Sequence, residues 1–283
     1  MDLPPYGVHG DRLQTQLGTD LHVSTLAGVK TCRSCRCAPM SVSTLMSSVL
    51  SLQPHYAEKQ DKEQINGLPV VRWEGDVVLV NQDQALPAAI AALRQERVLG
   101  FDTETRPSFR KGTSYDPTLI QLAGEKVVYL FQINLLQDHR PLAELLADTS
   151  IHKVGVGLSQ DIRQLQAIFS FKPGGFVDVG ETARHNNIAT RGLRSMAAAF
   201  FHVRISKRAQ CSNWAQEALQ PFQIIYAATD AWISRELYVA LANLSLVDAQ
   251  RDRVTLQPVK PKRLPRRGFR RAENGHAQEQ SSS

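Results

Sequence analysis

The sequence has no long hydrophobic run, no secretory signal pattern and no internal repeat. No apolar stretch approaches the roughly 18 to 20 residues that a membrane-spanning helix needs, so we expect a soluble protein that does not enter membranes. The first residues lack a basic segment followed by an apolar one, which argues against a secretory signal peptide. With 42% apolar residues the chain can still bury a sizeable core. These features predict a globular, cytoplasmic protein.

Cysteine is scarce, and its distribution favours reduced thiols. Of the four cysteines, Cys32, Cys35 and Cys37 lie close together, and Cys211 lies far away. A structural zinc site takes four ligands. The nearest upstream histidine, His22, lies ten residues before the cluster, which is not a zinc-site spacing. We therefore expect the reduced thiols of a cytosolic protein, with a zinc site as the alternative.

Positive charge is concentrated at the C-terminal end. The formal net charge is +6, and residues 260–283 hold seven basic and two acidic side chains, which leaves about +1 for the rest. Such a tail can neutralise nucleic-acid phosphates without reading sequence. It can equally be a solvated, disordered end. Both interpretations stay open for residues 249–283, which we predict to be disordered.

Hydrophobic periodicity predicts one α/β domain over residues 66–248. Residues 1–65 show no sustained periodicity and are interpreted as a disordered leader or an over-extended gene model, with Met40 and Met46 as alternative starts. Strands are expected at 77–80, 98–104, 118–123, 126–133, 153–157 and 175–179. Helices are expected at 85–93, 141–146, 159–169 and over most of 181–244. This order predicts a mixed sheet of about five or six strands with a hairpin on one side, flanking helices and an all-helical C-terminal part.

Two acids end the strand expected at 98–104. Asp102 and Glu104 are two residues apart, so their side chains point to the same face of the sheet. Burying two adjacent carboxylates is costly because each loses water and repels the other. A bound divalent cation offsets both penalties. The alternative is a strand end whose acids simply face water.

Three further residues gain their meaning from this pair. Asp161 falls near the start of a predicted helix, where an acid also serves as a favourable helix-end charge. Tyr226 and Asp230 are four apart on another predicted helix and so share one face. Taken alone, each fits a structural role: Asp161 as a charge at a helix end, and Tyr226 and Asp230 as part of a helix with an interfacial tyrosine. Together, the four acids and the tyrosine indicate a metal-dependent phosphodiesterase site.

The joint pattern resembles the three exonuclease motifs of the DEDD superfamily, in the form that has a tyrosine in motif III. Motif I matches Phe-Asp-Thr-Glu at 101–104, motif II Val-Gly-Val-Gly-Leu-Ser-Gln-Asp at 154–161, and motif III Tyr-Ala-Ala-Thr-Asp at 226–230. Ser-Asn-Trp at 212–214, followed by Gln223, is similar to the ribonuclease D version of motif III, and Leu-Ile-Gln-Leu at 119–122 resembles its second strand. The resemblance covers about residues 70–245.

The resemblance implies a ribonuclease-H-like fold and a 3′–5′ exonuclease that uses two Mg²⁺ or Mn²⁺ ions. In that case Asp102 bridges both ions, Glu104 and Asp230 hold the first, and Asp161 lies near the second. Tyr226 orients the attacking water. Because only about forty residues follow the domain, we expect a stand-alone exonuclease domain.

The substrate expected from the resemblance is a single-stranded 3′ end of DNA or RNA, and no protein partner can be inferred. The segment after motif I is basic with one aromatic ring. We predict that Arg106, Arg110 and Lys111 contact phosphates and that Phe109 stacks on a base. A solvated loop is the alternative.

Two other functions compete with the exonuclease. One is a catalytically inactive nucleic-acid-binding module of the same fold, against which the complete set of four acids argues, because binding alone does not need them. The other is an interaction protein whose acids are structural. It predicts that neither metal nor oligonucleotide changes the stability of the protein.

Overall fold

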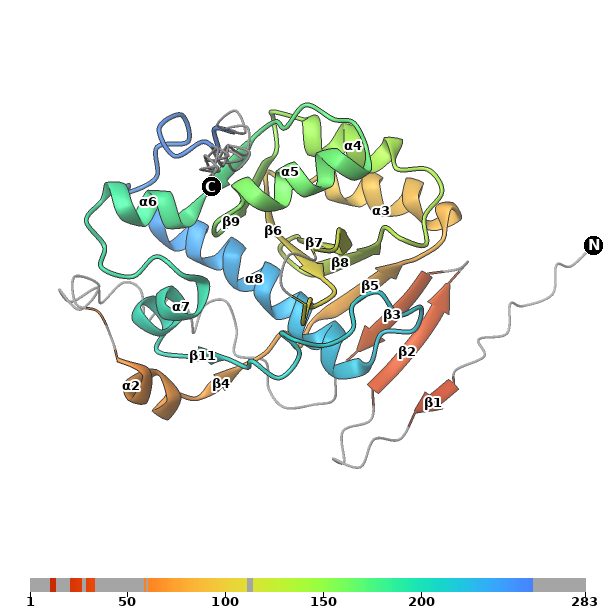
Figure 1. Cartoon of the computed structure of the whole chain (residues 1–283), viewed down its shortest axis with the longest axis horizontal. Coiled ribbons are helices and arrows are strands. Elements are labelled where there is room, and N and C mark those ends of the chain that lie inside the picture. The colour runs from red at the N-terminus through yellow and green to blue at the C-terminus, as the bar shows by residue number, and fades with distance from the viewer. Residues whose placement is uncertain are drawn as a thin grey trace, which may run out of the picture.

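A central sheet with helices on both faces organises the chain in the computed structural model, which describes residues 11–13, 21–26, 29–33, 59, 61–110 and 114–256 (Figure 1). Leu99 and Phe101 point to the face that α3, α4 and α5 cover, whereas Val98 packs toward the face that α8 covers. Strand side chains thus alternate between two hydrophobic clusters, one on each face. The sheet is buried on both sides.

Six strands from residues 76–178 form the mixed sheet that the sequence predicts. They are β5 (Asp76–Val80), β6 (Val98–Thr105), β7 (Pro117–Ala123), β8 (Val127–Gln132), β9 (His152–Gly155) and β10 (Phe176–Asp178). Their order is β5-β8-β7-β6-β9-β10, with β6, β7 and β8 antiparallel and the other pairs parallel. The predicted hairpin is confirmed as β7 and β8, joined at Gly124-Glu125.

Three additional strands extend the sheet beyond β5, in a region for which the sequence predicts no regular structure. They are β1 (Asp11–Leu13), β2 (Leu21–Leu26) and β3 (Val29–Arg33), and β3 runs antiparallel to β5. Strands this short give a weak periodic signal, and their pairing depends on the edge that β5 offers. Cys32 lies in β3, whereas Cys35 and Cys37 lie outside the described residues. The domain boundaries at 66 and 248 stay predictions.

Most of the helices lie where the sequence predicts them, but α2 and η2 were not expected, and α2 lies mostly in the segment interpreted as a disordered leader. The helices are α2 (Lys62–Gly67), the 3₁₀ turn η2 (Asp83–Ala85), α3 (Leu86–Leu93), α4 (Arg140–Ala147), α5 (Ser159–Ile168), α6 (Val179–His185), α7 (Leu193–Phe201) and α8 (Pro221–Asn243). None of the described helices is long and apolar enough to cross a membrane. Beyond α8, Val254 N donates to Phe176 O of β10, so the described chain still packs on the domain at that point.

The expectation that the C-terminal part is all helical is confirmed only in part, because residues 202–220, between α7 and α8, hold no helix and include one short strand. β11 (Arg204–Ile205) pairs in parallel with β4 (Val70–Val71). The Arg204 guanidinium also donates to Leu68 O at 2.9 Å, which ties β11 to the chain before β4. A two-residue strand has no periodicity to detect, so only its distant partner defines it.

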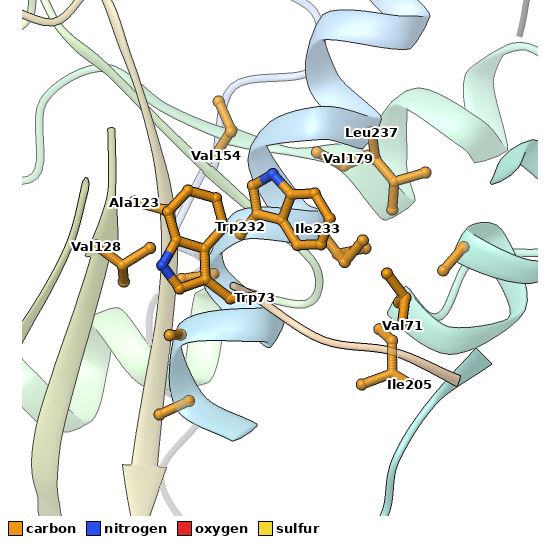
Figure 2. Close-up of a cluster of buried hydrophobic side chains, with 14 of the residues drawn as sticks. Val71, Trp73, Ala123, Val128, Val154, Val179, Ile205, Trp232, Ile233 and Leu237 are labelled. Atoms are coloured by element: carbon orange, nitrogen blue, oxygen red, sulfur yellow. The ribbon is translucent and has the colours of Figure 1, made fainter. Parts of the chain in front are cut away.

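The long helix α8 lies directly against β6 and is buried along most of its length. Gly100 allows this close approach, because a Cβ there would lie 1.9 Å from Ala231 O. Figure 2 shows Trp232 of α8 beside Trp73, with ring centroids 5.4 Å apart. Trp73 N also donates to Thr229 Oγ1 at 2.9 Å. The register of α8 on the sheet is thereby fixed, and with it the position of Asp230.

Candidate metal centre

Two elements bring three carboxylates together at the end of the sheet. Asp102 and Glu104 project from β6 on the face covered by α8, and Asp230 projects from α8. One oxygen from each of the three lies within 4.8 Å of the others. Asp230 is 5% exposed and the two strand acids are partly buried. The strand period and the helix contact at Gly100 are therefore enough to assemble the cluster.

The cluster is electrostatically unfavourable as three free carboxylates. Burial, followed by repulsion from Asp230 and Asp161, raises the pKa of Asp102 well above its ordinary value. Burial and repulsion from Asp102 raise the pKa of Glu104 in the same way. Burial also raises the pKa of Asp230, although a hydrogen bond from Tyr226 and the charge of Arg194 oppose the shift.

The donor set fits a divalent cation. Asp230 Oδ1 is buried and has no hydrogen-bond partner among the described residues, which is costly for a carboxylate oxygen. Carboxylate oxygens are the ligands that hard cations such as Mg²⁺ and Mn²⁺ prefer. A cation here would neutralise the repulsion and occupy the unpartnered oxygen. Asp102, Glu104 and Asp230 can therefore hold a divalent ion.

Asp161 lies apart from the three clustered acids. It occupies the first turn of α5, on the opposite face of the sheet, and accepts a hydrogen bond from Thr103 Oγ1 at 2.6 Å. Burial raises the pKa of Asp161, while the hydrogen bond from Thr103 opposes the rise. Its charge is still close enough to raise the pKa of Asp102. The fourth acid is thus a neighbour of the cluster, with its carboxylate turned toward Thr103.

Tyr226 lies one helical turn before Asp230 and hydrogen-bonds its carboxylate. Its ring packs against Trp214 with centroids 5.9 Å apart, and burial raises the pKa of its hydroxyl. The segment that carries Trp214 is attached to α8, because Gln223 Nε2 donates to Ser212 Oγ at 2.9 Å. The Ser-Asn-Trp stretch therefore holds Trp214 against the ring of Tyr226.

A cleft of about 620 Å³ opens onto the acids and has a basic wall that the sequence analysis missed. Asp102, Tyr226 and Asp230 lie on one side of it. Its basic lining residues come from α2, α7, β11 and the segment after β11: Lys62, Arg194, Arg204 and Lys207. In the sequence these residues look like ordinary solvated charges. The fold brings them to one surface, and the pairing of β4 with β11 places Lys62 of α2 among them.

The predicted substrate loop is exposed and lies outside this cleft. Phe109 is 87% exposed, and the guanidinium of Arg106 lies over the Tyr115 ring at 5.1 Å. Arg110 is exposed, and Lys111 lies outside the described residues. Neither Arg106, Phe109 nor Arg110 is among the described residues that line the cleft. Their contacts with a substrate stay predictions.

Comparison with known proteins identifies the fold and the family. A family model described as 3′–5′ exonuclease matches residues 77–245. Human exonuclease 3′–5′ domain-containing protein 2 is 38% identical over 181 residues, covering 58% of this chain and 29% of that protein. Ribonuclease D of Haemophilus influenzae is 29% identical over 201 residues, covering 69% of this chain and 49% of that protein. The chain thus spans about half or less of the length of these two relatives.

The three-dimensional comparison leads to the same fold. The Nibbler exonuclease domain of Aedes aegypti superimposes with a TM-score of 0.54 and 24% identity, covering 61% of this chain and 91% of that domain. The mixed sheet with α8 across one face is accordingly ribonuclease-H-like. The family match covers the strands and helices that carry all four acids and the tyrosine. This chain belongs to the 3′–5′ exonuclease family.

Proposed function

We propose that the chain is a metal-dependent exonuclease that hydrolyses phosphodiester bonds from the 3′ end of a nucleic acid. The observation that carries the proposal is the cluster of Asp102, Glu104 and Asp230, whose oxygens converge within 4.8 Å. A protein that only bound nucleic acid would gain nothing from burying three repelling carboxylates beside a basic wall. The family membership supports the same reaction.

The four acids would bind two divalent ions, Mg²⁺ or Mn²⁺. We assign Glu104, Asp102 and Asp230 to one ion, and Asp102 with Asp161 to the other. Bound divalent ions supply a nucleophilic hydroxide at neutral pH and offset the charge of the phosphate that is attacked. In this role Asp161 would turn its carboxylate away from Thr103, through a change of side-chain rotamer.

Tyr226 has a role that its hydrogen bond defines. Its hydroxyl donates to Asp230 and lines the cleft, where it can also accept a hydrogen bond from the attacking water. Because burial raises its pKa, the hydroxyl keeps its proton and acts by orientation rather than as a base. Tyr226 is therefore assigned to orienting the water.

The substrate class is a nucleic acid with a free single-stranded 3′ end. Lys62, Arg204 and Lys207 give the cleft the positive charge that phosphates require. The relative from Haemophilus influenzae is a ribonuclease D, and this similarity favours RNA as the substrate of the present chain. The hydrolysis itself does not involve the 2′ position, so DNA is the other candidate.

A digestion assay tests the proposal. Single-stranded RNA, single-stranded DNA and duplex DNA, each labelled at the 5′ end, are incubated with Mg²⁺, Mn²⁺ or a chelator. We expect a ladder that shortens from the 3′ end only when metal is present, and the preferred polymer shows which substrate is used. Products cut internally, or activity that persists in chelator, would contradict the proposal.

A further inference from the structure

One basic residue of the cleft stands closer to the acids than the rest of the basic wall. Arg194, in the first turn of α7, lines the cleft together with Asp102, Tyr226 and Asp230. Its charge is near enough to lower the pKa values of both Tyr226 and Asp230. It therefore lies beside the reacting end of the cleft rather than along its outer wall.

The guanidinium of Arg194 is held on one side and unpartnered on the other. Nη2 donates to Ser206 O at 2.8 Å, which fixes the side chain against the segment after β11. Nη1 is buried and has no hydrogen-bond partner among the described residues. Asp230 Oδ1, in the same cleft, is also buried and unpartnered, so these two atoms do not satisfy each other.

An unpartnered guanidinium nitrogen in a buried position calls for a physical reason, because a buried donor without an acceptor destabilises the fold. The carboxylates are not its partners, although they are close. A phosphate oxygen fits, because a guanidinium N–H donates a strong, charge-assisted hydrogen bond to it and the group stays charged at every working pH. The metal ions that offset the acids would leave this positive charge available to the substrate.

We propose that Arg194 binds the phosphate at the 3′-terminal linkage and stabilises the negative charge that it gains while it is cleaved. This inference rests on the proposed exonuclease function and assigns to it one further residue. The fixed position of the guanidinium matters, because a donor that is already oriented costs no reorganisation during the reaction. Ser206 O supplies that orientation.

The matched variants are Arg194→Gln, Arg194→Lys and, as a control, Arg191→Gln. Arg191 precedes α7 by two residues, is exposed and does not line the cleft, so its loss removes the same charge from the same segment. Thermal unfolding with and without Mn²⁺ first checks that each variant folds and keeps its response to metal. Single-turnover cleavage of a 5′-labelled single-stranded oligonucleotide then measures the chemical step.

We expect Arg194→Gln to slow cleavage by about 100-fold, as the loss of one oriented donor to a developing negative charge does. Arg194→Lys should recover part of the rate, because it keeps the charge and loses the fixed orientation of the guanidinium. Arg191→Gln should cleave at the wild-type rate. A wild-type rate in Arg194→Gln would overturn the inference.

A binding measurement with a modified substrate separates this role from a merely structural one. Each probe is a fluorescein-labelled oligonucleotide with one uncharged methylphosphonate, either at the terminal linkage or at the linkage before it. The probes are titrated with protein in the presence of Ca²⁺ instead of Mg²⁺. In the wild type and in Arg191→Gln, neutralising the terminal linkage should weaken binding more than neutralising the other one. In Arg194→Gln the difference between the two probes should be smaller than in the wild type, because only the contact of the terminal phosphate with metal remains.

Three outcomes distinguish the failure of this inference from the failure of the proposed function. If wild-type protein cleaves no oligonucleotide with any metal, the exonuclease proposal itself fails. If wild-type protein cleaves and the terminal methylphosphonate weakens binding equally in wild type and Arg194→Gln, only the role of Arg194 is removed. If neither linkage matters in the wild type, no phosphate is bound at this position and the inference is likewise wrong.

Discussion

The acids on the two faces of the sheet differ in their surroundings. On the face covered by α8, regular geometry alone brings Asp102, Glu104 and Asp230 together, leaving one oxygen of Asp230 unpartnered. On the face covered by α5, Asp161 lies outside the cluster and accepts a hydrogen bond from Thr103. Without a cation the first arrangement leaves buried carboxylates that repel one another, whereas in the second the hydrogen bond from Thr103 partly offsets the burial of Asp161. The three-acid cluster should therefore depend on metal, and Asp161 should be recruited when substrate and metal arrive.

The largest effect is expected from Asp102→Asn, which removes the acid shared by both proposed ions. Activity should fall at least about 1,000-fold, because the ions supply several kcal/mol of transition-state stabilisation. The measurement is single-turnover cleavage with Mn²⁺. The metal-free variant should unfold at a higher temperature than the wild type, because a buried, repelled carboxylate is gone.

Glu144→Gln is the matched control for that variant. Glu144 is an exposed acid on α4, paired with Arg94 at 3.1 Å, on the face away from the cluster. Its replacement should change neither activity nor the response to metal. Wild-type activity in Asp102→Asn would show that the clustered acids are not the catalytic metal site.

A smaller loss is expected from Asp161→Asn. Activity should fall about 100-fold, because one of the two acids assigned to the second ion is lost while the acids of the first ion remain. The metal-free melting temperature should change less than in Asp102→Asn, because Thr103 already satisfies this carboxylate. If Asp161→Asn instead raised the metal-free stability as much as Asp102→Asn, the difference between the two faces would be wrong.

Tyr226→Phe should be milder still. The ring keeps its packing against Trp214, and only the hydroxyl that bonds Asp230 is lost. We expect a fall in kcat of roughly 10- to 100-fold with little change in Mn²⁺ affinity, measured by steady-state kinetics and calorimetry. An unchanged kcat would show that the hydroxyl does not orient the water.

The clustered acids also predict how stability depends on pH. A carboxyl whose folded pKa exceeds its unfolded pKa of about 4 stabilises the fold fully below that value. The stabilisation is lost as the pH rises through the folded pKa, about 7 for Asp230. The metal-free protein should therefore melt a few degrees lower at about pH 8 than at about pH 6.

Metal should reverse this trend, because it takes the place of the protons. The rise in melting temperature on adding Mn²⁺ should be larger at about pH 8 than at about pH 6. Circular dichroism melts at both values, with and without chelator, make the comparison. A metal-free protein that gained stability between these two pH values would contradict the raised pKa values.

The smallest effect is expected from Thr103→Val. It removes the hydrogen bond to Asp161 and keeps the volume of the side chain. One hydrogen bond contributes about 0.5 to 1.5 kcal/mol, so cleavage should change by less than about tenfold. A loss as large as that of Asp161→Asn would mean that Thr103 positions the acid in the active state.

The difference between the two faces also explains what could be predicted from the sequence. Asp102 and Glu104 must lie on one face of the sheet, because strand side chains alternate with a period of two. Tyr226 and Asp230 must lie on one face of α8, because they are four residues apart on a helix. The mixed sheet followed from the hairpin and the later alternation of strands and helices. The orientation of Asp161 did not follow, because a rotamer choice leaves no pattern in the sequence.

The basic wall could not be predicted for a related reason. Arg194, Arg204 and Lys207 occur among many exposed charges, and nothing in their spacing indicates a common surface. Lys62 reaches the cleft only because β4 pairs with β11, over more than 130 residues of intervening chain. Long-range pairing of such short strands is invisible to periodicity, whereas the acids lie on long elements whose geometry is regular.

The most direct test of the central claim is a crystal structure of the protein with Mn²⁺, in which anomalous diffraction locates the ion. We predict an anomalous peak between the carboxylates of Asp102, Glu104 and Asp230, with Asp230 Oδ1 as a ligand. No peak at these three acids, or a peak elsewhere while their oxygens remain unpartnered, would contradict the account.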